Sequence, residues 1–422
     1  MKIGIITLQL QTNYGGVLQA FALQRVLENL GNDLEIIQLN EIIPEPKGLC
    51  LVRKILTRSF RRYVLHRRDV EIFRERRINR EFPIVGVEFV RFFRKYMKIR
   101  YIPSFGCITP GDYTAFVVGS DQVWRPKYNR NLMNSYLDFT WKDRGECIAS
   151  KSEECRANSS EYTKPQGWDV KRVSYAVSFG SAEWEYDAKE TAVAARLAGR
   201  FDALSFRELS GAINAEKHLG VDSSIVLDPT LLLSAEDYLS VLAPDYPQPA
   251  VSDEVGKTLH GNDCVFEYIL DRTSETLALV DEIESCFSKE QDLDRRLEIR
   301  RFLAADPRGT EDISKRVQPS VESWLEGISA ASLVVTDSFH ACVFSILFHR
   351  PFIVLGNHRR GLSRILWLLE QFGLLDRLVV LGSSGEISQD LLNWSTIDWD
   401  RIDRRLEELR SESLDFIKKN LN

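Results

Sequence analysis

The sequence predicts an α/β protein with mainly parallel sheets and more than one domain. Short runs of β-branched and aromatic residues alternate with helical stretches along the whole chain, as is typical of α/β folds. These runs show no strict alternation of polar and apolar residues, which favours parallel strands that are buried on both faces. With 422 residues, of which 44% are hydrophobic, the chain is long enough to form two domains, each with its own core.

The predicted elements follow one another in a regular order. The first strand, KIGIIT, leads into a loop with two glycines and then into a helix that ends near Gly31. The further strands of the first half are LEIIQL, AFVVGS, RVSYAVS, ALSF and SIVL, and those of the second half are CVFEYIL, SLVVT, FIVL and RLVVL. Helices are predicted in AVAARLAGR, VESWLEGIS and CVFSILFH, and again between residues 399 and 422. The polar stretch from Lys142 to Asp169 is predicted to be a surface loop or insertion.

Charge is distributed unevenly along the chain. The net charge of −6 argues against general binding of nucleic acid. Between Leu51 and Arg100, however, 16 Lys and Arg residues stand against 5 Asp and Glu residues. We predict one or two helices here, with arginines around the apolar positions Leu56, Phe60, Val64, Ile72 and Phe73. Two interpretations remain open: a solvated insertion that docks on its domain through the apolar stripe, or a helix that rests on an anionic membrane surface.

The cysteines and the apolar runs bear on the location of the protein. The seven cysteines form no C-x-x-C pair, which predicts reduced thiols and no metal site. No run of 18 apolar residues is present, and the chain begins with a strand pattern instead of a cationic leader, so we expect neither a membrane span nor a signal peptide. We therefore predict a cytoplasmic protein, with peripheral contact to the inner face of the cell membrane if the second interpretation of the basic segment holds.

Polar side chains follow the predicted strands at the points where these strands end. The carboxyl ends of parallel strands meet at one edge of a sheet, which is the edge where open α/β sheets bind ligands. Because the motifs recur in both halves of the sequence, they predict one shared cleft. They comprise Asn13, Tyr14 and Gly15, then Ser120, Asp121, Gln122 and Trp124, then Arg207 and Glu208, then Asp228, Pro229 and Thr230, and finally Asp337, Ser338 and His340.

The TDSFH segment carries the most chemistry among these motifs. A strand ends at Thr336 and a helix begins a few residues later, so its unpaired N–H groups and its dipole favour an anion beside His340. Capping by Asp337 or Ser338, and a purely structural histidine, are the alternatives. Arg207 either pairs with Glu208 or reaches into the cleft. A further cationic loop, for which surface solvation is the alternative, is predicted from Arg359, Arg360 and Arg364.

Several segments together resemble the polysaccharide pyruvyl transferase family, in the family's order and over almost the whole chain. They are NYGGVLQAFALQ, VVGSDQVW, SYAVSFG, SFRELSG, VLDPTLLL, SWLEGI and VVTDSFHACVFSILFHRPFIVL. The resemblance implies two Rossmann-like domains facing a cleft, as in GT-B glycosyltransferases, with the basic helical segment inserted. It also implies transfer of pyruvate from phosphoenolpyruvate to two hydroxyls of a sugar, which forms a cyclic ketal in a capsular, exopolysaccharide or cell-wall glycan precursor and releases phosphate.

The resemblance also implies roles for the residues at the strand ends. His340 is expected to be the general acid or a phosphate ligand, Arg207 the clamp for the donor's anionic groups, and Asp121 a base for a sugar hydroxyl. The donor side would further include Ser338, Arg359, Arg360 and Arg364. Trp124 is predicted to stack on the sugar, with core packing as the alternative. The acceptor side would consist of Asn13, Tyr14, Gly15, Ser120, Asp121, Gln122 and Trp124.

The resemblance suggests a division of the chain. Residues 1–228 would form the N-terminal, acceptor-side domain with the basic insertion at about 50–100, residues 229–398 the domain that binds phosphoenolpyruvate, and residues 399–422 a C-terminal helix. Phosphoenolpyruvate is expected as a substrate, with no cofactor, metal or nucleic acid, and the sugar acceptor is either free or lipid-linked. A glycosyltransferase that uses a nucleotide sugar and a non-catalytic glycan-binding protein are the alternatives.

Overall fold

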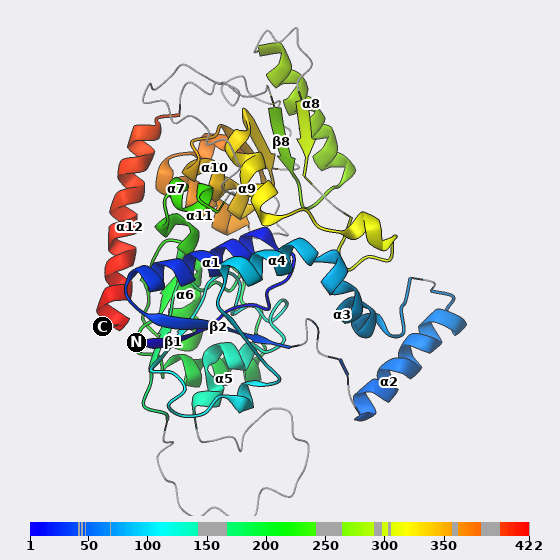
Figure 1. Ribbon diagram of the computed structural model, residues 1–422, viewed down its shortest axis with the longest axis vertical. Helices are drawn as coiled ribbons and strands as arrows, with labels where there is room; N and C mark the ends of the chain where they lie inside the picture. The colour runs from blue at the N-terminus through cyan, green and yellow to red at the C-terminus, as the bar shows by residue number, and fades with distance from the viewer. Residues whose placement is uncertain are drawn as a thin grey trace, which may run out of the picture.

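The computed structural model describes most of the chain and contains two parallel sheets (Figure 1). The described residues are 1–40, 43, 45–46, 48–67, 69–141, 167–241, 264–290, 298–302, 305–356, 362–380 and 397–421. Most of the polar stretch predicted between residues 142 and 169 therefore lies outside the described part, as do Arg359 and Arg360.

The first sheet belongs to the N-terminal half and has five parallel strands in the order β3-β2-β1-β4-β5. In its centre Ile5 of β1 pairs with Ile36 of β2 and Val117 of β4, all of which are buried. Two short parallel strands, β6 and β7, follow β5 in the sequence and pair with each other. The bounds are β1 Lys2–Ile6, β2 Asp33–Leu39, β3 Ile99–Ile102, β4 Ala115–Val118, β5 Lys171–Ser174, β6 Ser205–Phe206 and β7 Ser224–Ile225.

The second sheet belongs to the C-terminal half and also has five parallel strands, in the order β12-β11-β10-β8-β9. Its central strand β10 pairs with β8 on one side and β11 on the other. The two sheets confirm the predicted α/β class with mainly parallel strands in two Rossmann-like halves. The bounds are β8 Cys264–Tyr268, β9 Glu298–Arg301, β10 Leu333–Thr336, β11 Phe352–Gly356 and β12 Leu378–Val380.

Every predicted strand is present, and two strands were not predicted. The missed strands, β3 and β9, lie at sheet edges and contain charged residues such as Arg100 and Arg301. Edge strands are buried on fewer sides and often carry charges, so they lack the continuous apolar run by which the central strands were recognised.

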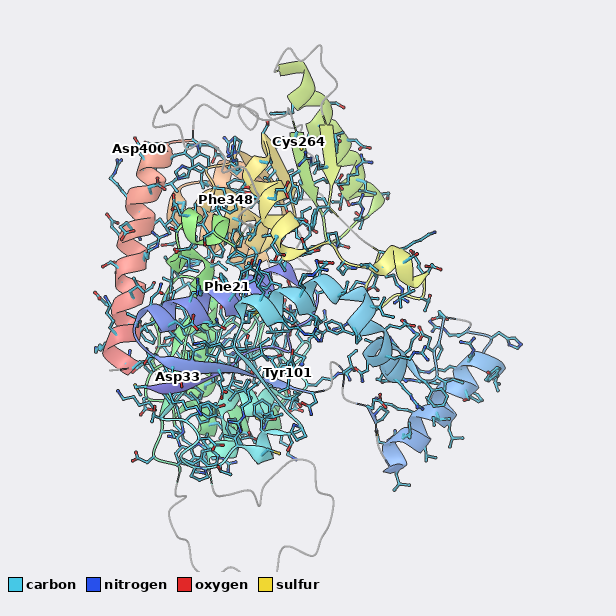
Figure 2. All side chains as sticks on the ribbon, in the orientation of Figure 1. Phe21, Asp33, Tyr101, Cys264, Phe348 and Asp400 are labelled. Carbon is cyan, nitrogen blue, oxygen red and sulfur yellow. The ribbon has the colours of Figure 1, made fainter. Side chains whose placement is uncertain are left out.

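Helices connect the strands and cover the sheets. Asn13 caps α1 by accepting a hydrogen bond from the backbone N of Gly16, and Figure 2 shows Phe21 of this helix in the middle of the molecule. Among the described helices, none is long and apolar enough to cross a membrane. The bounds are α1 Tyr14–Asn29, α2 Gly48–Ser59, α3 Arg74–Val85, α4 Val87–Tyr96, α5 Ala188–Ala198, α6 Leu209–Asn214, α7 Ala235–Leu239, α8 Ser274–Glu290, α9 Val321–Ala330, α10 Phe339–Leu347, α11 Leu362–Phe372 and α12 Trp399–Leu421.

The C-terminal helix α12 runs along both halves and ends near the N-terminus (Figure 1). Its Ser413 accepts a hydrogen bond from the backbone N of Leu227, and its Phe416 packs near Tyr175, which follows β5. The last helix of the chain thus returns to the N-terminal half and ties the two halves together. One apolar core also runs through both halves and includes Val17 of α1 and Phe344 of α10.

The basic segment forms an arm that projects from the body (Figure 1). It consists of α2 and a π-helical turn at Phe60–Val64, and α3 leads from it back toward α4. The docked interpretation of its apolar stripe is wrong, because Leu56, Phe60 and Val64 are 66%, 53% and 56% exposed. The arm is instead attached by ion pairs, chiefly between Arg58 of α2 and Glu75 of α3.

Candidate interdomain site

A cavity of about 510 Å³ lies between the two halves, and both contribute to its wall. On the N-terminal side the wall is formed by residues that follow β1 and β4, among them Thr7 and Asp121. On the C-terminal side it is formed by residues that follow β8 and β10, among them Leu270 and Asp337.

The strand order explains why these loops meet at the cavity. In the first sheet the connections reverse direction between β1 and β4, and in the second sheet they do so between β8 and β10. Loops diverge at such a switch point and leave a crevice at the carboxyl ends of the strands, where α/β proteins bind their ligands. Here the two crevices open into the same cavity.

His340 lies in the first turn of α10, directly after the switch point of the second sheet. The helix begins there because Ser338 caps it, accepting a hydrogen bond from the backbone N of Ala341. The imidazole is buried and lines the cavity, and its Nε2 atom has no hydrogen-bond partner among the described residues. Burial lowers the pKa of His340, although Asp228, at 3.9 Å from Nε2, and Asp121 oppose this shift. The side chain is therefore neutral at neutral pH.

The first turn of α1 packs against the same histidine. A Cβ atom on Gly15 would lie 1.9 Å from Nδ1 of His340, so only glycine permits this approach. The first helix of the N-terminal half and the histidine of the C-terminal half therefore meet at one point.

Arg207 follows β6 and is enclosed by three carboxylates. Its Nη1 donates to Asp228 at 2.7 Å, its Nη2 donates to Asp121 at 2.9 Å, and its Nε lies 3.4 Å from Glu208. The guanidinium also lies over the ring of Phe339, 4.8 Å from its centre. Burial alone would lower the pKa of Arg207, but the carboxylates outweigh burial and raise it. We call this group the Arg207 cluster: Arg207, Asp121, Asp228 and Glu208.

The carboxylates of Asp121 and Asp228 are held in the charged form. Burial tends to raise the pKa of each, but Arg207 and the nearby His340 lower it below the ordinary value. Asp228 also accepts hydrogen bonds from the backbone N and the hydroxyl of Thr230. The predicted role of Asp121 as a base is therefore disfavoured, because a carboxylate with a lowered pKa takes up a proton poorly.

Arg364 is a buried cation in the cavity wall. It lies in α11, and its Nη1 is 3.9 Å from Asp121. Burial, together with the neighbouring Arg207, lowers the pKa of Arg364 to about 10, so the guanidinium is still charged at neutral pH. Its charge lies in the same wall as the imidazole of His340.

The structure brings part of the predicted site together. The predicted site residues that line the cavity are Asn13, Asp121, Gln122, Ser338, His340 and Arg364. Arg207 does not line it, because its guanidinium faces the carboxylates of its own cluster. Arg359 and Arg360 lie outside the described residues.

Four predicted acceptor-side residues do not line the cavity in the described part of the structure. Trp124 is fully buried and stacks on Tyr136 in the N-terminal core, so of its two predicted roles the structure favours core packing. Tyr14 is buried at the contact between the halves, where its hydroxyl donates to the backbone O of Pro319. Ser120 is also buried, and its hydroxyl donates to the backbone O of Ala176. Gly15 acts through its contact with His340.

The structure also gives places in the site to residues to which the sequence assigned no role. Asp228 joins Arg207 to His340, and its only signal in the sequence was its place after a strand. Tyr128 lines the cavity and is 49% exposed, so an aromatic ring is available near the place where Trp124 was expected. Amide side chains line the same side: Gln9, Gln11, Asn129, Asn131 and Asn134.

Two α/β halves that enclose a polar cavity between their switch points define a two-domain α/β protein with an interdomain site. The chain matches the polysaccharide pyruvyl transferase family from residue 13 to residue 359, and it belongs to that family. A sequence search among curated proteins finds no match.

Solved structures resemble the chain only distantly. One is UDP-GlcNAc 2-epimerase from Methanocaldococcus jannaschii, with 12% identity, a TM-score of 0.40 and coverage of 96% of this chain and 92% of that one. UDP-GlcNAc 2-epimerase from Neisseria meningitidis, bound to UDP-GlcNAc, has 8% identity, a TM-score of 0.44 and coverage of 100% and 99%. Acinetobacter baumannii MurG has 10% identity, a TM-score of 0.37 and coverage of 99% of both chains.

Proposed function

We propose that this protein transfers pyruvate from phosphoenolpyruvate to two hydroxyls of a sugar and releases phosphate. The product would be a cyclic ketal in a capsular, exopolysaccharide or cell-wall glycan precursor. The observation that carries the proposal is that His340 and Arg364, both buried, lie in the wall of one cavity whose N-terminal side carries several amide side chains.

Phosphoenolpyruvate carries a carboxylate and a phosphate, so its site needs fixed positive charge. Arg364 supplies a guanidinium, which can hold two oxygens of either group at once. The N-terminus of α10, at Ser338, adds the positive end of a helix dipole. Arg207 is assigned a positioning role instead of the predicted clamp, because it holds Asp121 and Asp228, which flank His340 and Arg364.

The reaction needs one proton delivered to carbon and two proton losses from hydroxyls. In the first step a sugar hydroxyl oxygen bonds to C2 of the donor, while the methylene carbon C3 takes a proton and becomes a methyl group. In the second step another hydroxyl of the sugar bonds to C2, and the C2–O bond to phosphate breaks. Both hydroxyl protons leave to a base or to the departing phosphate. These steps need acid–base groups only, so the proposal includes no metal or organic cofactor.

His340 is our candidate for the acid that protonates C3. Its pKa is lowered in the protein by burial, but a bound phosphate dianion nearby would favour the imidazolium and raise that pKa. Donor binding would thus load the proton that the first step consumes. After the transfer, the neutral imidazole can accept a proton from the second hydroxyl.

The N-terminal wall suits the sugar. Amides such as Asn13 and Gln122 can both donate to and accept from hydroxyls, and Tyr128 offers a ring on which a sugar face can stack. We place the reaction in the cytoplasm, where the acceptor is a glycan precursor that is either free or lipid-linked.

A phosphate-release screen tests the proposal. Purified protein is mixed with phosphoenolpyruvate and with galactose-, mannose-, glucose- or N-acetylmannosamine-containing acceptors, and at least one acceptor should release phosphate. In a parallel thermal-shift assay the protein should be stabilised by phosphoenolpyruvate and not by nucleotide sugars. Stabilisation by a nucleotide sugar alone would favour a glycosyltransferase, and acceptor binding without phosphate release would favour a non-catalytic glycan-binding protein.

A further inference from the structure

The outer face of the arm is a continuous strip of exposed apolar side chains. In α2 none of the described residues is buried. Five of the exposed apolar residues, from Leu49 to Tyr63, recur every three or four positions, which places these five on one side of a helix; Val64 and Leu65 follow directly. We call this strip the outer face: Leu49 (88% exposed), Val52 (52%), Leu56 (66%), Phe60 (53%), Tyr63 (66%), Val64 (56%) and Leu65 (55%).

The opposite face of the arm is the one that attaches to the protein. Arg58 donates two hydrogen bonds to Glu75 of α3, at 2.6 and 2.7 Å, and Lys54 adds a third at 3.2 Å. Arg62 donates to the backbone O of Val70. The bond from Arg58 outweighs burial and lowers the pKa of Glu75 to about 2, so this attachment stays charged at neutral pH. The arm is therefore built to turn its apolar side outward.

The arm carries positive charge that its attachment does not use. From Leu51 to Val70 the sequence has seven Lys and Arg residues against one Asp. Arg53 and Arg61 are exposed on the arm itself and are not used in its attachment to α3 through Glu75. A helix with a large apolar strip and cations beside it is typical of segments that lie in the headgroup region of an anionic bilayer.

We propose that the outer face binds the surface of an anionic lipid membrane. Binding would bury the exposed apolar side chains in the headgroup region, while Arg53 and Arg61 meet the lipid phosphates. A second copy of the chain is a poorer partner, because a symmetric contact would bring two such positive segments together. This proposal does not depend on the proposed reaction.

Membrane binding would also present the cavity to the membrane. α3 joins the arm to the cavity rim, since Asn79 of α3 makes two hydrogen bonds with the backbone of Ile43, which lines the cavity. Arg77 of α3 donates to the backbone O of Arg308, and the Arg308 side chain donates to Gln11 on the rim. A docked arm would therefore hold the cavity mouth close to lipid-linked molecules.

Flotation with vesicles tests the proposal on the full chain. Wild-type protein should float with vesicles of phosphatidylglycerol and phosphatidylcholine at low salt, and much less with phosphatidylcholine alone. The variant Leu56→Ser/Phe60→Ser should reduce the bound fraction at least tenfold, and Arg53→Gln/Arg61→Gln should reduce it about tenfold. The matched controls Leu375→Ser and Arg405→Gln change an exposed leucine and a partly exposed arginine far along the chain and should bind like wild type.

Two results would overturn the proposal. One is the absence of wild-type flotation on anionic vesicles at low salt. The other is a dimer in light scattering that both arm variants dissociate without any change in vesicle binding, since the outer face would then be an interface between copies. Because the substituted residues are exposed and leave the Arg58–Glu75 attachment intact, circular dichroism and thermal midpoints of all variants should match wild type.

Discussion

Arg207 and Arg364 are both buried, and both lie beside Asp121, but their surroundings differ. Arg207 meets two carboxylates at 2.7 and 2.9 Å and a third at 3.4 Å, and its pKa is raised. Arg364 lies 3.9 Å from Asp121, and burial lowers its pKa to about 10. Arg207 is thus enclosed by the carboxylates of its own cluster, whereas Arg364 lines the cavity. This difference separates a cluster that holds the site together from a wall that can bind an anion.

The largest expected effect is on the chemistry in the cavity wall. His340→Ala should lower the rate of phosphate release by about 10²–10⁴-fold, because loss of a positioned acid typically costs that much. The measurement is kcat with saturating phosphoenolpyruvate and acceptor. His218→Ala is the matched control, since His218 is a partly exposed histidine stacked on Trp184 in the N-terminal half. Full activity in the His340 variant would remove this residue from the mechanism.

The Arg207 cluster should respond through stability. Arg207→Met leaves three buried carboxylates without their cation, and breaking a buried ion pair from one side costs about 3–5 kcal/mol. We expect the thermal midpoint to fall by on the order of 10 °C, and activity to fall with it. Adding Asp228→Asn to this variant should restore part of the loss, because one uncompensated charge is removed. If the Arg207 variant keeps its stability but has a higher KM for phosphoenolpyruvate, Arg207 binds the donor's anionic groups after all.

Arg364 should respond through donor binding. Arg364→Gln removes a charged hydrogen-bond donor from the cavity wall, which should weaken phosphoenolpyruvate binding by about 2–3 kcal/mol. The KM for phosphoenolpyruvate should rise, whereas the KM for the acceptor should change little and the thermal midpoint should fall less than in Arg207→Met. The contrast with Arg207→Met is the point of the measurement: if both variants lose stability to the same degree, the two arginines belong to one structural cluster.

The sequence was sufficient for the central strands and for part of the site. Buried parallel strands are continuous apolar runs, and polar residues at their ends converge because the strands are parallel, which is why Asn13, Asp121, Ser338 and His340 share one cavity. Partners far apart in sequence were not predictable. The hydroxyl of Tyr14 donates a hydrogen bond to the backbone O of Pro319, which lies 305 residues away in the sequence. Only the fold reveals that this tyrosine is enclosed.

The orientation of the arm could not be predicted from the sequence either. An amphipathic pattern tells that a helix has two faces, but it does not tell which face meets the protein. Glu75 decides this, because it draws Arg58 and Lys54 inward and leaves Leu56 and Phe60 outside. A charge on one neighbouring helix thus reversed the usual arrangement.

The smallest expected effect concerns pH, and it tests whether the donor loads the proton on His340. In the free protein the pKa of His340 is lowered from 6.5, so the imidazolium that protonates C3 is lost as pH rises through a value below 6.5. Accordingly, kcat/KM for phosphoenolpyruvate should decline above that value, by up to tenfold for each pH unit. A bound phosphate dianion raises the pKa, so kcat, which reports the complex, should hold to a higher pH before it declines. In wild type, kcat/KM and kcat should therefore decline at different pH values. Both pH profiles are measured at a saturating acceptor concentration. If both rate constants decline at the same pH, the donor does not alter the protonation of His340, and the idea that donor binding loads the proton is wrong.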